Sequence, residues 1–178
     1  VIGLDATAPG AEQTGIDFRP GDAKRLLILG DDAAAPAVCS ILEQLPTHAA
    51  EVEAVVEVPQ LARKIEAGPD GHWTDSRGNR INIRWQERLS ERGDRLAEAI
   101  EDHLHRFPLP RCQQDSPEEG PDDLLWDTPA SPPQEFYSWI AGESTMVRRL
   151  RRILVNDHGV DRRHIAFMSY WRHGSAGM

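Results

Sequence analysis

The chain has 178 residues, of which 39% are hydrophobic and 28% charged, a composition that fits about one globular domain with a sizeable core. Twenty-nine acidic residues against 20 basic ones give a net charge of −9, which argues against broad electrostatic binding to nucleic acid or an anionic membrane. No apolar run reaches the roughly 18 residues of a membrane span, and no signal-peptide pattern is visible. We therefore expect a cytoplasmic protein with no nucleic-acid partner and no membrane span.

The chain begins with a segment of low periodicity and then a strand and a helix. Residues 1–21 predict an irregular leading segment or linker, so the domain is expected to span residues 22–178. The apolar run over residues 25–29 is typical of a buried parallel strand. A helix is predicted to begin near Pro36, because proline fits the first helical turn, and to stop at Pro46.

The next part of the chain predicts two more strands. Residues 51–58 are rich in valine and predict the second strand, and the apolar spacing of residues 61–65 predicts a short helix. Residues 70–79 are turn-rich. Residues 80–85 alternate like a third strand, and its polar face suits an edge position.

A helix and an irregular stretch follow. Residues 94–106 have one apolar helical face, with Asp94 expected as the N-cap. Residues 107–134 hold seven prolines and several acidic residues, too few of them apolar to pack, and therefore predict a solvated loop. Residues 124–126 are the exception and are expected to anchor this loop to the surface.

The last part of the chain predicts a strand, helix, strand unit. The strands are expected at residues 135–141 and 165–170, and the amphipathic helix at residues 144–156. Its solvated face is expected to hold Arg148, Arg149, Arg151 and Arg152. Strands that alternate with helices predict an α/β fold with a doubly wound, mostly parallel five-stranded sheet.

Two parts of the chain resemble one protein family. Residues 139–143 (Trp-Ile-Ala-Gly-Glu), the arginine-rich helix and residues 170–174 (Tyr-Trp-Arg-His-Gly) are similar to the C-terminal NAD(P)H-binding domain of siderophore-interacting proteins. These are flavin-dependent ferric-siderophore reductases related to ferredoxin reductases. Residues 26–38 are similar to the family's first strand, its Gly-Asp-acidic loop and its first helix. The resemblance implies the strand order 3-2-1-4-5, NADH or NADPH as a cofactor, and a ferric siderophore as a partner.

The turn after the first strand is one candidate cofactor site. Gly30 allows a tight turn, while small Ala33 and Ala34 leave the N–H groups at the helix start open to a pyrophosphate. Asp31 and Asp32 suit a phosphate only if their carboxylates cap the helix or point away. From the residues alone, a capped turn and a cofactor site are equal alternatives, and the resemblance favours the cofactor.

A carboxylate stands at the end of the second strand. Glu57 can accept a hydrogen bond from a ribose hydroxyl there, or it can be a solvated charge at a strand end. The choice between NADH and NADPH stays open.

The turn after the fourth strand is the stronger candidate. Gly142, which follows Ala141, permits close approach of a ring, and Ser144 or Thr145 can cap the helix, whose N-terminus carries a partial positive charge. The resemblance implies that Gly142 and Glu143 orient the nicotinamide.

The chain's aromatic and basic end completes the predicted site. Core packing with a surface charge would explain Trp171 and Arg172. The resemblance instead implies that this end faces the flavin and the electron-rich ferric siderophore, with Arg172 as the contact to the siderophore.

No metal site is predicted, because the seven histidines are scattered, and no catalytic triad is predicted, because nothing in the sequence orients a base onto a nucleophile. No flavin-binding barrel is predicted before residue 26, and hydride must pass through flavin to become single electrons for iron. We therefore expect FAD from a missing N-terminal domain or from a partner protein. The alternatives are a free-standing, non-enzymatic nucleotide-binding or interaction module and, less well supported, a phosphorylation receiver domain, for which the required lysine is missing.

Overall fold

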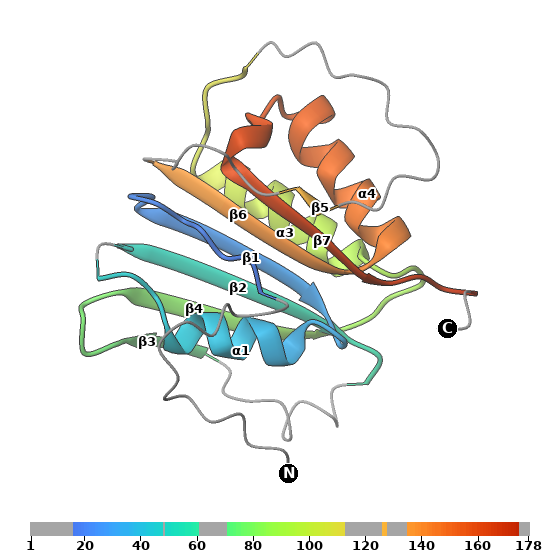
Figure 1. Cartoon of the computed structure of the whole chain (residues 1–178), viewed down its shortest axis with the longest axis horizontal. Coiled ribbons are helices and arrows are strands. Elements are labelled where there is room, and N and C mark those ends of the chain that lie inside the picture. The colour runs from blue at the N-terminus through green and yellow to red at the C-terminus, as the bar shows by residue number, and fades with distance from the viewer. Residues whose placement is uncertain (1–15, 48, 61–70, 113–125, 128–134, 175–178) are drawn as a thin grey trace.

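The computed structural model describes residues 16–47, 49–60, 71–112, 126–127 and 135–174. Within these ranges one sheet of seven strands has the order β3-β4-β2-β1-β6-β7-β5 (Figure 1). The strands are β1 (Arg25–Asp31), β2 (Glu51–Val58), β3 (Gly71–Thr74), β4 (Arg80–Glu87), β5 (Trp126–Asp127), β6 (Phe136–Glu143) and β7 (Ile165–Trp171). The helices are α1 (Ala35–Glu43), α3 (Asp94–Arg106) and α4 (Ser144–Arg152), with a π-helix at Ile153–Asp157 and a 3₁₀ turn at Arg162–His164.

The five central strands confirm the predicted order. β4, β2, β1, β6 and β7 are neighbours in that sequence, and every pair among them is parallel. The chain runs outward from β1 through β2 to β4 and then returns to β6 on the other side of β1. The strand order therefore reverses between β1 and β6, which is where doubly wound sheets bind ligands, at the carboxyl ends of the strands.

Two antiparallel strands extend the predicted sheet. β5 pairs with β7, and β3 pairs with β4, so the expected turn-rich stretch contains a strand and β4 is not an edge strand. Contacts of β3 and of the turn that joins it to β4 explain this difference. Trp73 packs against the core, and the Asp75 carboxylate closes a tight turn by accepting hydrogen bonds from the N–H groups of Arg77 and Asn79, each at 2.9 Å.

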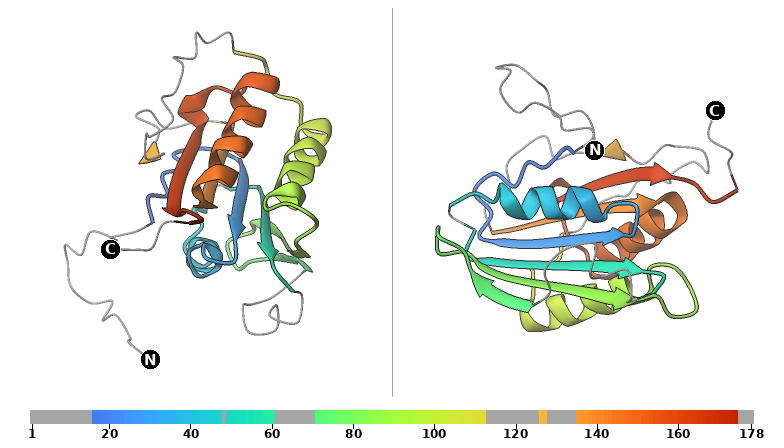
Figure 2. Two further views of the ribbon diagram at one scale, coloured as in Figure 1. Left: turned by 90° about the vertical axis from the view of Figure 1, so that its right-hand side faces the viewer. Right: turned by 90° about the horizontal axis from the view of Figure 1, so that it is seen from below.

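Helices cover both faces of the sheet. α1 lies on one face, and α3 and α4 lie side by side on the other (Figure 2). The strands β1, β2 and β6 are buried on both faces, which is why apolar residues dominate them.

The helix boundaries differ from the prediction in two places. α3 begins at Asp94 as expected, but the N-cap position belongs to Gly93, which has a φ of 88°. α4 ends at Arg152, and the chain continues as the π-helix instead of an α-helix to residue 156. Arg151, expected in solvent, is buried with its guanidinium carbon 5.5 Å from the ring centre of Phe167, because an arginine stem and an aromatic face pack well together.

Some expectations fall outside the described residues, namely the helix at residues 61–65 and most of the loop at 107–134. Residues 16–21 contain no helix or strand, and Ile16 and Phe18 pack against the core. Among the helices that the structure describes, none is long and apolar enough to cross a membrane.

Candidate functional site

Asp31 is the centre of the carboxyl edge of the sheet. Its side chain is fully buried, and its Oδ1 accepts hydrogen bonds from the N–H groups of Ala33 (3.0 Å) and Ala34 (3.3 Å). Its Oδ2 accepts from the N–H of Glu143 at 3.0 Å and from the indole Nε1 of Trp171 at 3.1 Å. Burial raises the pKa of Asp31, and the hydrogen bonds from Glu143 and Trp171 oppose the rise. One carboxylate thus ties the turn after β1 to the ends of β6 and β7.

Gly30 and Gly142 are needed for this close packing. A Cβ on Gly30 would lie 2.9 Å from the Cβ of Ala34, and one on Gly142 would lie 2.6 Å from the Cγ of Asp31. Gly142 also has a φ of 145°, which side chains rarely allow. Both glycines, like Ala141 beside them, are buried, so they shape the loops from within.

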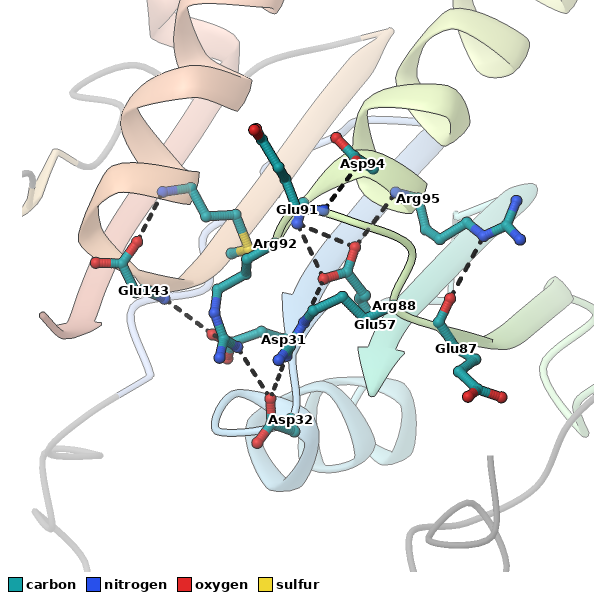
Figure 3. Close-up of polar contacts among 12 residues, drawn as sticks. Asp31, Asp32, Glu57, Glu87, Arg88, Glu91, Arg92, Asp94, Arg95 and Glu143 are labelled. Carbon is teal, nitrogen blue, oxygen red and sulfur yellow. Dashed lines mark hydrogen bonds and ion pairs between the residues drawn. The ribbon is translucent and has the colours of Figure 1, made fainter. Parts of the chain in front are cut away.

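Asp32 lies in a different environment, because arginines and not backbone groups hold it. Its Oδ1 accepts from Nη2 of Arg88 at 2.9 Å and from Nη1 of Arg92 at 3.1 Å, and 36% of its side chain is exposed. Both arginines come from the segment between β4 and α3, and Figure 3 shows them pointing toward Asp32. Arg92 also lies 3.3 Å from Oδ2 of Asp31.

Glu57, fully buried at the end of β2, holds the beginning of α3. Its two oxygens accept from the N–H of Gly93 at 2.9 and 3.0 Å, and Oε2 accepts from the N–H of Arg95 at 3.2 Å. Nε of Arg88 donates to Oε1 at 3.0 Å. The helix N-terminus therefore gets its capping acceptor from a neighbouring strand, which explains why Asp94 is not the cap.

Glu143 caps α4, a role that the sequence suggested for Ser144 or Thr145. The Glu143 carboxylate accepts from the N–H groups of Thr145 at 2.7 Å and Met146 at 3.0 Å, and from the Ser144 hydroxyl at 3.3 Å. The N–H of His173 adds a bond at 3.2 Å. Burial raises the pKa of Glu143, but the backbone donors outweigh it and hold that pKa below its ordinary value.

Trp171 ends the last strand beside this cluster, and Arg172 follows it. The pairing of β6 with β7 shifts by one residue between Gly142 and Glu143, which places Trp171 opposite Glu143. The guanidinium carbon of Arg92 lies 4.6 Å from the ring centre of Trp171, a cation–π contact, whereas Arg172 is exposed.

The structure therefore gathers the predicted residues at one edge, where the turn after β1 and the ends of β2, β6 and β7 meet. Arg88 and Arg92 were missed by the sequence analysis. They belong to no motif, although two arginines just after a predicted strand and before a helix were a usable signal. Among the described residues, no group of three or more histidine, cysteine, aspartate or glutamate side chains could hold a metal ion.

Two cavities lie at the opposite, amino-terminal edge of the sheet. One of about 330 Å³ is lined by Glu53, His103 and Arg106 among others, and one of about 580 Å³ lies beside Arg25 and Phe136. Neither includes a predicted site residue.

Known structures share this fold. The chain is similar to SipS, a siderophore-interacting protein from Aeromonas hydrophila (24% identity, TM-score 0.53, 88% of this chain and 54% of that one), and to the siderophore-interacting protein of Acinetobacter baumannii (18%, 0.56, 90% and 51%). A siderophore utilization protein from T. fusca is also similar (20%, 0.52, 88% and 48%). The chain spans about half the length of these proteins, and at these identities the likeness establishes the fold alone.

The sequence itself carries the family assignment. No curated protein matches the chain significantly in sequence. The sequence model of the siderophore-interacting protein family, in contrast, matches residues 23–174, which is most of the chain and includes every strand of the sheet. The chain therefore belongs to the siderophore-interacting protein family.

Proposed function

We propose that this chain is the NAD(P)H-binding part of a flavin-dependent ferric-siderophore reductase. The observation that carries the proposal is the convergence of the turn after β1, the Gly142 turn and Trp171 at the point where the strand order reverses. The family assignment supports the link to siderophores.

The residues at this edge of the sheet fit a dinucleotide when one group of them shapes the loops and another group contacts the ligand. The buried carboxylates of Asp31, Glu57 and Glu143 are satisfied by the chain's own donors, so they shape the loops and do not contact the ligand. The half-buried Arg88, Arg92 and Trp171 are the groups left to contact it. Arginines suit the phosphates, and an indole face suits a planar ring.

In this proposal the chain binds and orients NADH or NADPH and excludes water around the ring. A bound nicotinamide would supply hydride to a flavin, which passes single electrons to iron. In this proposal a flavin-binding domain or a partner protein supplies the FAD. Exposed Arg172 is the proposed contact to the anionic ferric siderophore.

Calorimetric titration with NADH and NADPH tests the proposal. We expect a Kd of roughly 10 to 1000 μM for at least one of them. Trp171→Ala should weaken that binding, while Trp171→Phe, which keeps a ring face, should retain most of it. A folded sample that gives no heat with either nucleotide would refute nucleotide binding.

A second readout concerns the flavin. The purified chain should be colourless and should not reduce a ferric siderophore with NADH or NADPH. A flavin absorbance spectrum would show that the chain holds its own flavin site.

The alternative is a non-enzymatic interaction module of the same family. One observation favours it, namely that the carboxylates at the edge of the sheet are already satisfied internally. Absence of nucleotide binding together with a flavin-free native complex would support this alternative.

A further inference from the structure

We propose that Arg88 and Arg92 form the subsite for the pyrophosphate of the bound dinucleotide, and that Asp32 occupies this subsite as an internal substitute until the ligand displaces it. The inference rests on the proposed nucleotide-binding function. It assigns the phosphate contacts to side chains that lie outside the sequence motifs of the two turns.

Asp32 differs from the other carboxylates at this edge of the sheet. Asp31, Glu57 and Glu143 accept hydrogen bonds from backbone N–H groups and are buried. Within the part of the chain that the structure describes, Asp32 has only arginine partners, and 36% of its side chain is exposed. Its carboxylate can leave without uncapping a helix or exposing a buried charge.

The turn after β1 needs such cations if it is to bind a phosphate. The N–H groups of Ala33 and Ala34, which would otherwise face an anion, already donate to Asp31. Positive charge for a pyrophosphate must therefore come from side chains, and Arg88 and Arg92 are the cations that meet at this turn.

Both arginines are held in place independently of Asp32. Arg88 donates through Nε to Glu57, which leaves Nη2 for the anion, and Arg92 contacts Asp31 and the ring of Trp171. A single oxygen of Asp32, Oδ1, accepts the hydrogen bonds from both guanidinium groups. A pyrophosphate offers several oxygens to the same donors. When it replaces Asp32, both arginines therefore stay ordered and gain further hydrogen-bond acceptors.

Asp32→Asn tests the exchange, because it removes the competing charge and keeps the shape. We expect NADH, NADPH and ADP, which share the pyrophosphate, all to bind about five- to tenfold tighter than to the wild type. Glu135→Gln is the matched control. It removes a carboxylate from an arginine pair, with Arg25 at 3.7 Å, at the other edge of the sheet and should leave all three affinities unchanged.

Arg92→Gln should change the affinities in the opposite direction, about five- to tenfold weaker, with Arg92→Lys intermediate. Thermal melts check that each variant is folded. If Asp32→Asn is unstable, the affinities of the two Arg92 variants test the subsite. Unchanged affinity in Asp32→Asn, a gain restricted to NADPH, or tighter binding in Arg92→Gln would overturn the proposal. The last result would mean that Arg92 blocks the crevice.

The probes separate this proposal from the proposed function. If NADH and NADPH bind the wild type but Asp32→Asn binds no tighter, the subsite is refuted and the nucleotide function stands. If neither dinucleotide binds any variant while ADP binds Asp32→Asn more tightly than the wild type, the subsite stands and the NAD(P)H function fails. If none of the three ligands binds, both proposals fail.

Discussion

Replacing Glu57 with glutamine should be among the most damaging conservative changes in this protein. The side chain is fully buried and accepts hydrogen bonds from two backbone N–H groups of the α3 start and from the Arg88 guanidinium. Glutamine keeps one acceptor oxygen but turns an N–H₂ donor toward groups that are themselves donors. It also leaves Arg88, which is 18% exposed, without its buried counter-charge.

The expected loss follows from these contacts. Hydrogen bonds to a charged group contribute about 1.5 to 3 kcal/mol each, and breaking a buried ion pair costs about 3 to 5 kcal/mol. These effects overlap, and glutamine retains part of the capping, so we expect a loss of about 3 kcal/mol in the free energy of unfolding. For a chain of this size that corresponds to a fall of roughly 6 to 12 °C in Tm.

Urea unfolding followed by circular dichroism at pH 7 measures the loss. Glu51→Gln is the matched control, because Glu51 lies on the same strand and pairs with Arg80 but is 35% exposed, and its partner is 68% exposed. That change should cost less than about 1 kcal/mol. If Glu57→Gln loses no more stability than Glu51→Gln, Glu57 is not the structural cap that we infer, and its role as a ribose acceptor regains support.

Two further predictions concern other contacts of the sheet. Burial raises the pKa of Glu53, but hydrogen bonds from His103 and Arg106 outweigh it and lower the pKa from 4.5 to about 2. Because the folded pKa is depressed, the ionised Glu53 stabilises the folded state fully above pH 4.5, and this stabilisation is lost as the pH falls toward 2. In urea titrations over that pH range, Glu53→Gln should therefore lose less of its free energy of unfolding than the wild type does. Gly142→Ala should lower the free energy of unfolding by about 2 to 4 kcal/mol, because of backbone strain and overlap with Asp31. The control is Gly78→Ala, at a φ of 87° with no atom within 4 Å of the added Cβ, which should lower it by only about 1 kcal/mol. The fall in Tm measures both losses. Similar losses in the two glycine variants would contradict the close approach at Gly142.

The five parallel strands could be predicted from apolar or alternating stretches bounded by turns, and their order could be predicted from the resemblance to the family. The capping roles of Glu57 and Glu143 could not. Glu57 reaches Gly93 across 36 residues of sequence, and such a contact has no local signature. For Glu143, the adjacent Ser144 gave the stronger local capping signal. β3 was missed because its four residues lie within a stretch of turn-forming residues, and its pairing depends on β4.

The two acidic residues that face α3 from β2 hold this helix at both ends. Glu57 binds the first N–H groups of the helix, and Glu53 binds His103 and Arg106 in its last turn, at 2.8 and 2.5 Å. Helix ends usually fray before the body of a helix opens, because their backbone groups have few partners. In α3 both ends are bound to the same central strand. Amide exchange at its termini should therefore require opening of the sheet as well, so that α3 and β2 behave as one cooperative unit.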